Sequence, residues 1–147
     1  MDVIWRILAT LALVALNGYF VACEFAAVGS RASRLEGLAE EGGLLARLAW
    51  RVKQRLDLYL SSCQLGVTLA SLGLGAVTEP AVASILMPVL GWAGVNHRDI
   101  YALSFAVAMI ISTCLHIVIG EQVPKNWAIR YADHTLPILA GPLVAFT

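Results

Sequence analysis

Residues 7–29 form an apolar run in which only Asn17 and Glu24 are strongly polar. A helix needs about 20 mainly apolar residues to cross a bilayer, so the run is long enough. It is also longer than the roughly 7–15-residue apolar core of a secretory signal peptide, and no Ala-x-Ala-like cleavage site follows it. The run therefore predicts a transmembrane helix that is retained.

Two further apolar runs, residues 58–77 and 100–119, also have the length of a membrane span, and we expect the first of these to continue as a helix or turn through Glu79-Pro80. The chain is 59% hydrophobic and 14% charged, whereas soluble domains are roughly 45–50% apolar and about 25% charged. We therefore expect an all-α membrane protein with three transmembrane helices and a loop-like stretch over residues 88–99. A shorter apolar stretch, residues 136–146, is either an interfacial helix or the start of a longer segment.

The segment between the first two runs has the pattern of a helical hairpin over residues 33–56. Ser33 and Glu36 have the spacing of a capping box, which predicts that a short helix begins at Ser33. Gly42 and Gly43 would end that helix, and an amphipathic helix with basic residues would follow. Such a helix can rest on the membrane surface or on the bundle.

Lysine and arginine are unevenly distributed along the chain. Six of the ten basic residues lie between the first two runs, and two more follow the third run. The positive-inside rule therefore places the hairpin and the C-terminus in the cytoplasm and the N-terminus outside. We expect a multi-pass protein of the cell membrane, and the zero net charge gives no indication of a nucleic-acid partner.

Polar residues inside the spans are the candidate functional groups, because ionisable side chains in a bilayer usually face a bundle interior or a wet cavity. We expect these groups, but not Asn17, to converge on the cytoplasmic half of the bundle. They are Glu24 and Ser30 with the first run, Gln64, Thr68 and Ser71 on one face of the second, and Ser112, Thr113, His116 and Glu121 with the third.

The end of the third run combines three features that indicate an ion site. Pro124 removes the helical hydrogen bond to the carbonyl of Gly120, four residues earlier, which leaves a bare oxygen beside the Glu121 carboxylate. Hydroxyls from Ser30 and from the polar face of the second span would complete an all-oxygen site. Such a site suits Mg²⁺ or Ca²⁺, and broken helices recur at the ion sites of transporters.

Structural interpretations remain open for the other groups. Serine and threonine hydroxyls bond within or between helices, His116 can serve as a packing residue, and Glu24 can bond a neighbouring helix. The three cysteines lack the spacing of a zinc or redox motif and suit helix packing. Metalloprotease, serine-hydrolase and phosphate-loop motifs are absent, so we expect no enzymatic activity.

Several segments together resemble the DUF21 transmembrane domain of the CNNM/CorC family, whose members are often labelled haemolysin-like. The resemblance covers essentially the whole chain. It implies a homodimeric Mg²⁺ transporter or exporter, with Na⁺ entry as the coupled reaction. The matching segments are residues 17–20, 22–26, Ser30 with 33–36, 59–71, Glu79-Pro80 and, most specifically, 120–125.

The resemblance also implies a cytoplasmic hairpin, a juxtamembrane helix over residues 133–147, and a set of metal ligands. Ser30 and Glu121 match family ligands, and Gly120 is the candidate for a backbone ligand. Many members carry asparagines where this chain has Val67 and Ser71, so Ser71 would offer a hydroxyl and Val67 nothing. Family members usually continue into nucleotide-binding CBS domains, which this chain does not contain.

The leading hypothesis is therefore a Mg²⁺ transporter that works by alternating access. Its inward-facing all-oxygen site would consist of Ser30, Ser71, Gly120 and Glu121. The alternative is a membrane scaffold or regulator that modulates another ion transporter through the hairpin. A pore-forming haemolysin would need a continuous polar stripe, which three short spans do not offer.

Overall fold

The computed structural model describes residues 2–94 and 96–147, and over those residues it contains helices and no strand. Three helical stretches are long and apolar enough to cross a membrane, namely Ile4–Gly29, Leu56–Trp92 and Asp99–Arg130. The predicted all-α architecture with three candidate spans is therefore confirmed. The elements are α1 (Asp2–Gly29), α2 (Ala32–Glu40), α3 (Leu44–Gln54), α4 (Leu56–Trp92), α5 (His97–Leu115), η1 (His116–Gln122), α6 (Val123–Arg130) and α7 (Ala132–Phe146).

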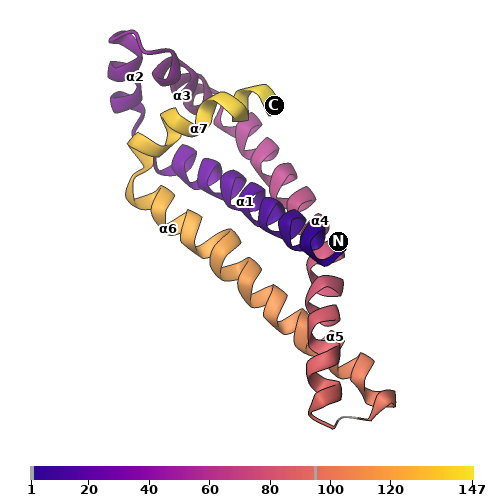
Figure 1. Ribbon diagram of the computed structural model, residues 1–147. Coiled ribbons are helices and arrows are strands. Elements are labelled where there is room, and N and C mark those ends of the chain that lie inside the picture. Colours follow the sequence, from indigo (N-terminus) through magenta and orange to yellow (C-terminus); the bar gives the residue numbers. More distant parts are fainter. Residues whose placement is uncertain (1, 95) are drawn as a thin grey trace.

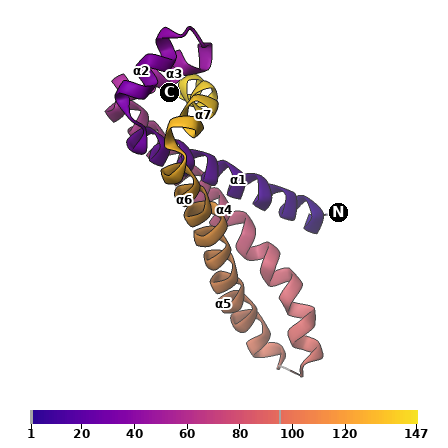
Figure 2. The ribbon, with the colours of Figure 1, turned by 90° about the vertical axis from the view of Figure 1, so that its left-hand side faces the viewer.

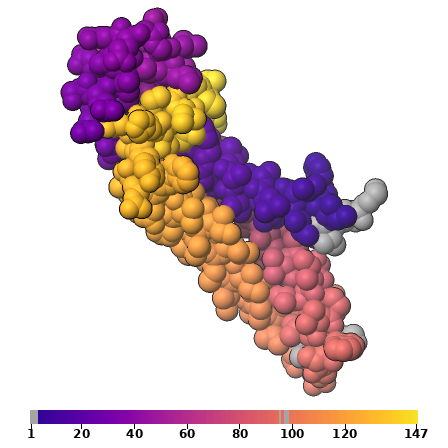
Figure 3. Space-filling view, turned by 60° about the vertical axis from the view of Figure 1, so that its left-hand side comes forward, coloured from indigo at the N-terminus to yellow at the C-terminus, as the bar shows by residue number. Residues whose placement is uncertain are grey.

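The long helices form an open bundle, and the short helices gather at one of its ends. Helix α1 packs along α4, and α5, η1 and α6 continue one another as a single rod beside them (Figure 1). Helices α2, α3 and α7 cluster at one end, whereas the α4–α5 hairpin extends past α1 at the other (Figure 2). The space-filling view shows the N-terminal part of α1 diverging from that hairpin (Figure 3).

Helix α4 is longer than the second apolar run suggested. It includes both Pro80 and Pro88 and ends at Trp92, so the expected loop over residues 88–99 is reduced to a short turn. Gly94 in this turn has φ +82°, a left-handed conformation that glycine adopts without steric cost. Continuing the helix satisfies the backbone polar groups internally, which an apolar environment requires.

The hairpin forms with a different start from the one predicted. Helix α2 begins at Ala32, with Arg31 as its N-cap and no side-chain capping bond, so the capping box at Ser33 is wrong. The turn falls at the predicted glycines, where Gly42 has φ +99°. A side chain from another helix contacts the N-cap residue instead. Asp133 Oδ1 accepts a hydrogen bond from the Arg31 backbone N–H at 2.8 Å.

Helix α7 lies across the end of the bundle and packs on α1 and α3 (Figure 1). Leu136, Ala140 and Leu143 are fully buried there, which accounts for the apolar stretch that the sequence left open. The Arg31 guanidinium joins the same contact by donating from Nε and Nη2 to Asp133 Oδ2 at 3.1 and 2.9 Å. The corner between α1 and α2 is therefore tied to the start of α7.

Helices α1 and α4 approach closely because a glycine faces an aromatic ring. A Cβ atom added at Gly66 would lie 2.5 Å from the Phe20 ring. Phe20, Cys23 and Cys63 are buried in the same core, where the two cysteines are free thiols. Cys23 and Cys63 therefore serve as small buried packing residues, as expected.

We predict that Gly66→Ala destabilises the fold by about 1–3 kcal/mol, because the added methyl group overpacks the α1–α4 contact. Gly75→Ala on the same helix is the matched control, since a Cβ there meets nothing within 4 Å. Thermal unfolding of both variants in detergent measures the difference. Equal unfolding temperatures for the two variants would contradict the close approach at Gly66.

The contact between Arg31 and Asp133 also predicts that the stability of the fold depends on pH. The Arg31 backbone N–H, together with the guanidinium, holds the pKa of the Asp133 carboxyl below its usual value of 3.8. A carboxyl with a lowered folded-state pKa stabilises the fold above its unfolded pKa and loses that contribution as the pH falls through the folded value. Asp133→Asn should therefore be less stable than the parent chain at pH 7, and the difference should shrink below about pH 4. Unfolding temperatures at pH 7 and pH 3 test this, and a constant difference would refute it.

Candidate ion-binding site

The third span changes its helical form at the segment that the sequence singled out. Residues His116–Gln122 form a π-helical turn, in which the Val123 N–H donates to the carbonyl of Val118, five residues earlier. Pro124 follows at once and packs on α1, where a Cβ added at Gly18 would lie 2.9 Å from its Cγ. Single π-helical turns inside α-helices occur frequently at functional sites.

The Gly120 carbonyl is not bare, as the sequence had suggested. The Asn17 side chain on α1 donates to it through Nδ2 at 2.8 Å, and both residues are buried. A side chain at position 120 would crowd this bond, because an added Cβ would lie 3.2 Å from Asn17 Nδ2 and 3.1 Å from His116 Cδ2. The proline thus leaves an acceptor, and a polar residue of another helix fills it.

The Asn17 contact also reaches the second candidate span, through Ser71 on α4. The Ser71 hydroxyl donates to Asn17 Oδ1 at 3.2 Å, and its oxygen lies 3.4 Å from His116 Nε2. Since a hydroxyl has one proton, a bond to His116 in this arrangement requires the tautomer that carries a proton on Nε2. Asn17, Ser71, His116 and Gly120, here called the polar cluster, therefore link α1, α4 and η1 inside the bundle.

The structure brings together only part of the predicted ligand set. Ser71 and Gly120 meet through Asn17, and Glu121 follows directly in the chain with a half-buried side chain. Its carboxylate makes no hydrogen bond or ion pair within the part of the chain that the structure describes. Ser30 lies 13 residues after Asn17, about 20 Å along α1, and its hydroxyl donates to Ala27. Ser30 is therefore not brought to the other three residues.

Two of the other polar side chains form hydrogen bonds within their own helices, which was the structural interpretation left open for them. The Thr68 hydroxyl donates to the Gln64 carbonyl at 2.8 Å, and Ser112 donates to Ala108. Both bonds join residues four positions apart in one helix. These contacts bind the hydroxyl protons and leave the oxygen atoms able to accept.

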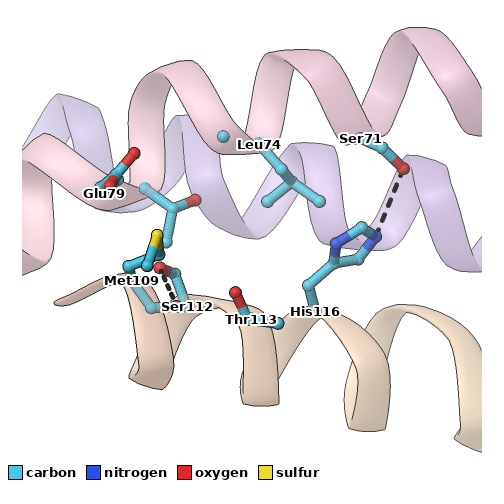
Figure 4. A pocket seen from close by; sticks show the side chains of 9 residues that line it. Ser71, Leu74, Glu79, Met109, Ser112, Thr113 and His116 are labelled. Carbon is cyan, nitrogen blue, oxygen red and sulfur yellow. Dashed lines mark hydrogen bonds between the residues drawn. The ribbon is translucent and has the colours of Figure 1, made fainter. Parts of the chain in front are cut away.

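A cavity of about 130 Å³ adjoins the polar cluster on the side away from the hairpin. Ser71 and His116 lie at one end of it and Glu79 at the other, with Ser112 and Thr113 between them (Figure 4). A volume of this size accommodates several waters at about 30 Å³ each. The cavity therefore continues the line of polar groups from the cluster toward the α4–α5 turn.

Glu79 is the residue that sequence reasoning undervalued. One of its carboxylate oxygens, Oε1, is buried and has no hydrogen-bond partner among the described residues. A buried polar atom normally has a hydrogen-bond partner, so such an atom in a polar cavity points to a water or a cation. The signal in the sequence was a glutamate between two apolar stretches, which both belong to the helix α4 in the structure.

Comparison with known proteins agrees with the resemblance noted in the sequence. The family model described as the cyclin M transmembrane N-terminal domain, CNNM, matches residues 8–147. The UPF0053 protein YhdT of Bacillus subtilis is 47% identical over 134 residues, which cover 91% of this chain and 29% of that protein. The UPF0053 protein YhdP of the same organism is 40% identical over 146 residues, which cover 99% of this chain and 33% of that protein.

A further relative is an uncharacterized protein of Mycobacterium tuberculosis, which is 38% identical over 146 residues that cover 41% of its length. The chain therefore spans about a third of the length of these curated relatives. The family match extends over nearly all of its residues, including the π-helical turn and the polar cluster. This chain belongs to the CNNM family, as its transmembrane domain.

Proposed function

We propose that this domain binds and transports a divalent cation, with Mg²⁺ as the substrate. The observation that carries the proposal is the π-helical turn inside a membrane span, where the Glu121 carboxylate follows a Gly120 carbonyl held by Asn17. Ionisable groups at this depth are costly, and they mark ion pathways in membrane proteins. Family membership supports the same substrate class.

The donor atoms near the turn suit a hard cation. Glu121 offers a carboxylate, Gly120 a carbonyl with a second lone pair, and Ser71 a hydroxyl oxygen. Mg²⁺ prefers oxygen ligands at about 2.0–2.1 Å and keeps several waters, so a few protein ligands are sufficient. Asn17 adds an amide oxygen to this set, although it was the one polar residue of the first span that was not expected to converge on the site.

Ser30 has a different place in the proposal from the other three candidates. It lies near the hairpin end of α1, about 20 Å along the helix from Asn17. Ser30 would therefore contact the ion where it enters the domain, and not together with Ser71, Gly120 and Glu121. Glu24 lies between the two, about 10 Å from Asn17 on the same helix. These groups would guide an ion from the hairpin side toward the turn.

Alternating access is proposed because polar groups lie on both sides of the polar cluster. Glu121 follows Gly120 in the direction of the hairpin end, and the cavity with Glu79 lies on the side away from the hairpin. The hydrogen bonds among Asn17, Ser71 and Gly120 would separate the two sides and rearrange when the ion passes. Transport needs such an exchange between two arrangements of packed helices.

The remaining parts of the proposal are supported by family membership and the charge distribution. They are Na⁺ entry as the coupled reaction, a homodimer, CBS domains in the longer protein, location in the cell membrane, and the absence of enzymatic activity. The basic hairpin would face the cytoplasm and the N-terminus the outside, because six of ten basic residues lie between the first two spans.

We predict that Glu121→Gln lowers the affinity for Mg²⁺ at least about tenfold and leaves the fold intact, because the amide lacks the charge that a hard cation requires. Calorimetry and the Mg²⁺-dependent rise in unfolding temperature measure this. Glu40→Gln, at an exposed position on α2, makes the same chemical change as a control. An unchanged Mg²⁺ affinity in the Glu121 variant would refute the site.

We predict that Glu79→Gln slows Mg²⁺ flux into or out of liposomes while Mg²⁺ binding at Glu121 persists. The reason is that Glu79 supplies the carboxylate of the cavity beyond the polar cluster. Asp57→Asn, near the other end of α4, is the control for the change of charge. Equal flux for the Glu79 variant and the parent chain would remove Glu79 from the pathway.

The scaffold hypothesis has one observation in its favour. Leu44 and Leu45 on the hairpin are 71% and 49% exposed, which leaves an apolar surface for another protein. Reconstitution of the purified protein in liposomes that contain a Mg²⁺-sensitive dye separates the two functions. A transporter changes the dye signal when a Mg²⁺ gradient is applied, whereas a scaffold alone leaves it unchanged.

A further inference from the structure

A basic hollow lies where two corners of the chain meet at the hairpin end of the bundle. Its volume is about 420 Å³. The corner between α1 and α2 contributes Arg31 and Arg34, and the corner between α6 and α7 contributes Arg130, Asp133 and His134. The corners pack directly on each other, because a Cβ added at Gly29 would lie 3.3 Å from the Ala132 methyl group.

The hollow has an excess of positive charge. Its one acid, Asp133, is taken by Arg31, which donates its backbone N–H to Oδ1 and two guanidinium N–H groups to Oδ2. Arg34 and Arg130 have no acidic partner within ion-pair distance among the residues that the structure describes. Guanidinium groups present planar sets of donors that match the oxygen atoms of a phosphate.

The position of the hollow indicates a ligand that is partly apolar. The first candidate span ends at Gly29 and the third at Arg130, so a bilayer around these spans would have its lipid headgroups at the level of the hollow. Trp127 and Tyr131 pack edge to face beside it, with ring centroids 5.9 Å apart, and both are at least half exposed. Exposed tryptophan and tyrosine at a span end are typical of the membrane interface.

We propose that this hollow binds the phosphate group of an anionic phospholipid. Arg34 and Arg130 contact the phosphate from opposite corners, and the acyl chains lie along α6, where Ile129 is 52% exposed. Basic pockets between membrane helices recur as sites for anionic headgroups. A bound lipid would brace the α1–α2 corner against α7 in addition to the Arg31–Asp133 contact. The proposal is independent of the transport function.

The test compares the double variant Arg34→Gln/Arg130→Gln with the matched control Arg51→Gln/Arg55→Gln. The control removes the same charge from exposed arginines outside the hollow. Each detergent-solubilised protein is titrated with phosphatidylglycerol and with phosphatidylcholine, and bound lipid is counted by native mass spectrometry. The parent chain and the control should prefer phosphatidylglycerol, and the double variant should lose about tenfold in affinity for it.

Two measurements on the parent chain alone complete the test. Competition with inorganic phosphate identifies the source of the phosphate group, and the comparison of the two lipids tests selectivity without any variant. Inorganic phosphate is added to the parent chain together with phosphatidylglycerol, and it should not displace the lipid at equal concentration. Displacement would indicate a site for phosphate from solution and would overturn the proposal. Equal binding of the two lipids by the parent chain, or equal losses in the double variant and the control, would overturn it as well.

Discussion

The structure depends on one backbone acceptor that a proline leaves unfilled inside a membrane span. Pro124 has no N–H to give to the Gly120 carbonyl, and a bilayer offers no water in its place. Asn17 on the neighbouring helix α1 donates a hydrogen bond to this carbonyl at 2.8 Å. This bond fixes α1 against the third span at the same depth as the π-helical turn. It also explains why a strongly polar residue is buried in the middle of the first span.

Small residues make that contact possible. Gly18 allows Pro124 to approach α1, Gly120 leaves room for the Asn17 amide, and Gly66 admits the Phe20 ring. Membrane helices associate through close packing and interhelical hydrogen bonds, because lipid removes the hydrophobic drive between them. The polar cluster and the glycine contacts thus depend on each other: the glycines bring the helices close, and the cluster sets their register. Glu121 and the cavity with Glu79 are held in place by this arrangement.

The sequence predicted the architecture better than it predicted the site. Three spans follow from apolar runs that no soluble core of this size can bury, and the hairpin turn follows from Gly42 and Gly43. A disturbance of the helix near Gly120 was indicated by Pro124, because that effect is local, but its π-helical form was not predicted. The Asn17 contact joins residues 103 positions apart, and no local pattern determines which face of α1 meets η1. The sequence could not place Ser30 relative to Gly120 either, because the level at which η1 meets α1 is set by this same long-range contact. Glu79 was undervalued because the apolar run ends at Val77 and the chain was expected to pass through Glu79-Pro80 as a helix or a turn, whereas α4 continues as a helix to Trp92.

The central claim is that the π-helical turn of the third span holds a divalent cation. Anomalous diffraction from crystals of the protein grown with Mn²⁺ in place of Mg²⁺ tests it most directly, since Mn²⁺ accepts the same oxygen ligands. We predict an anomalous peak within about 2.3 Å of a Glu121 carboxylate oxygen, with the Gly120 carbonyl among the ligands of the ion. Anomalous density at other acidic residues, with none at Glu121 in the same crystal, would contradict it.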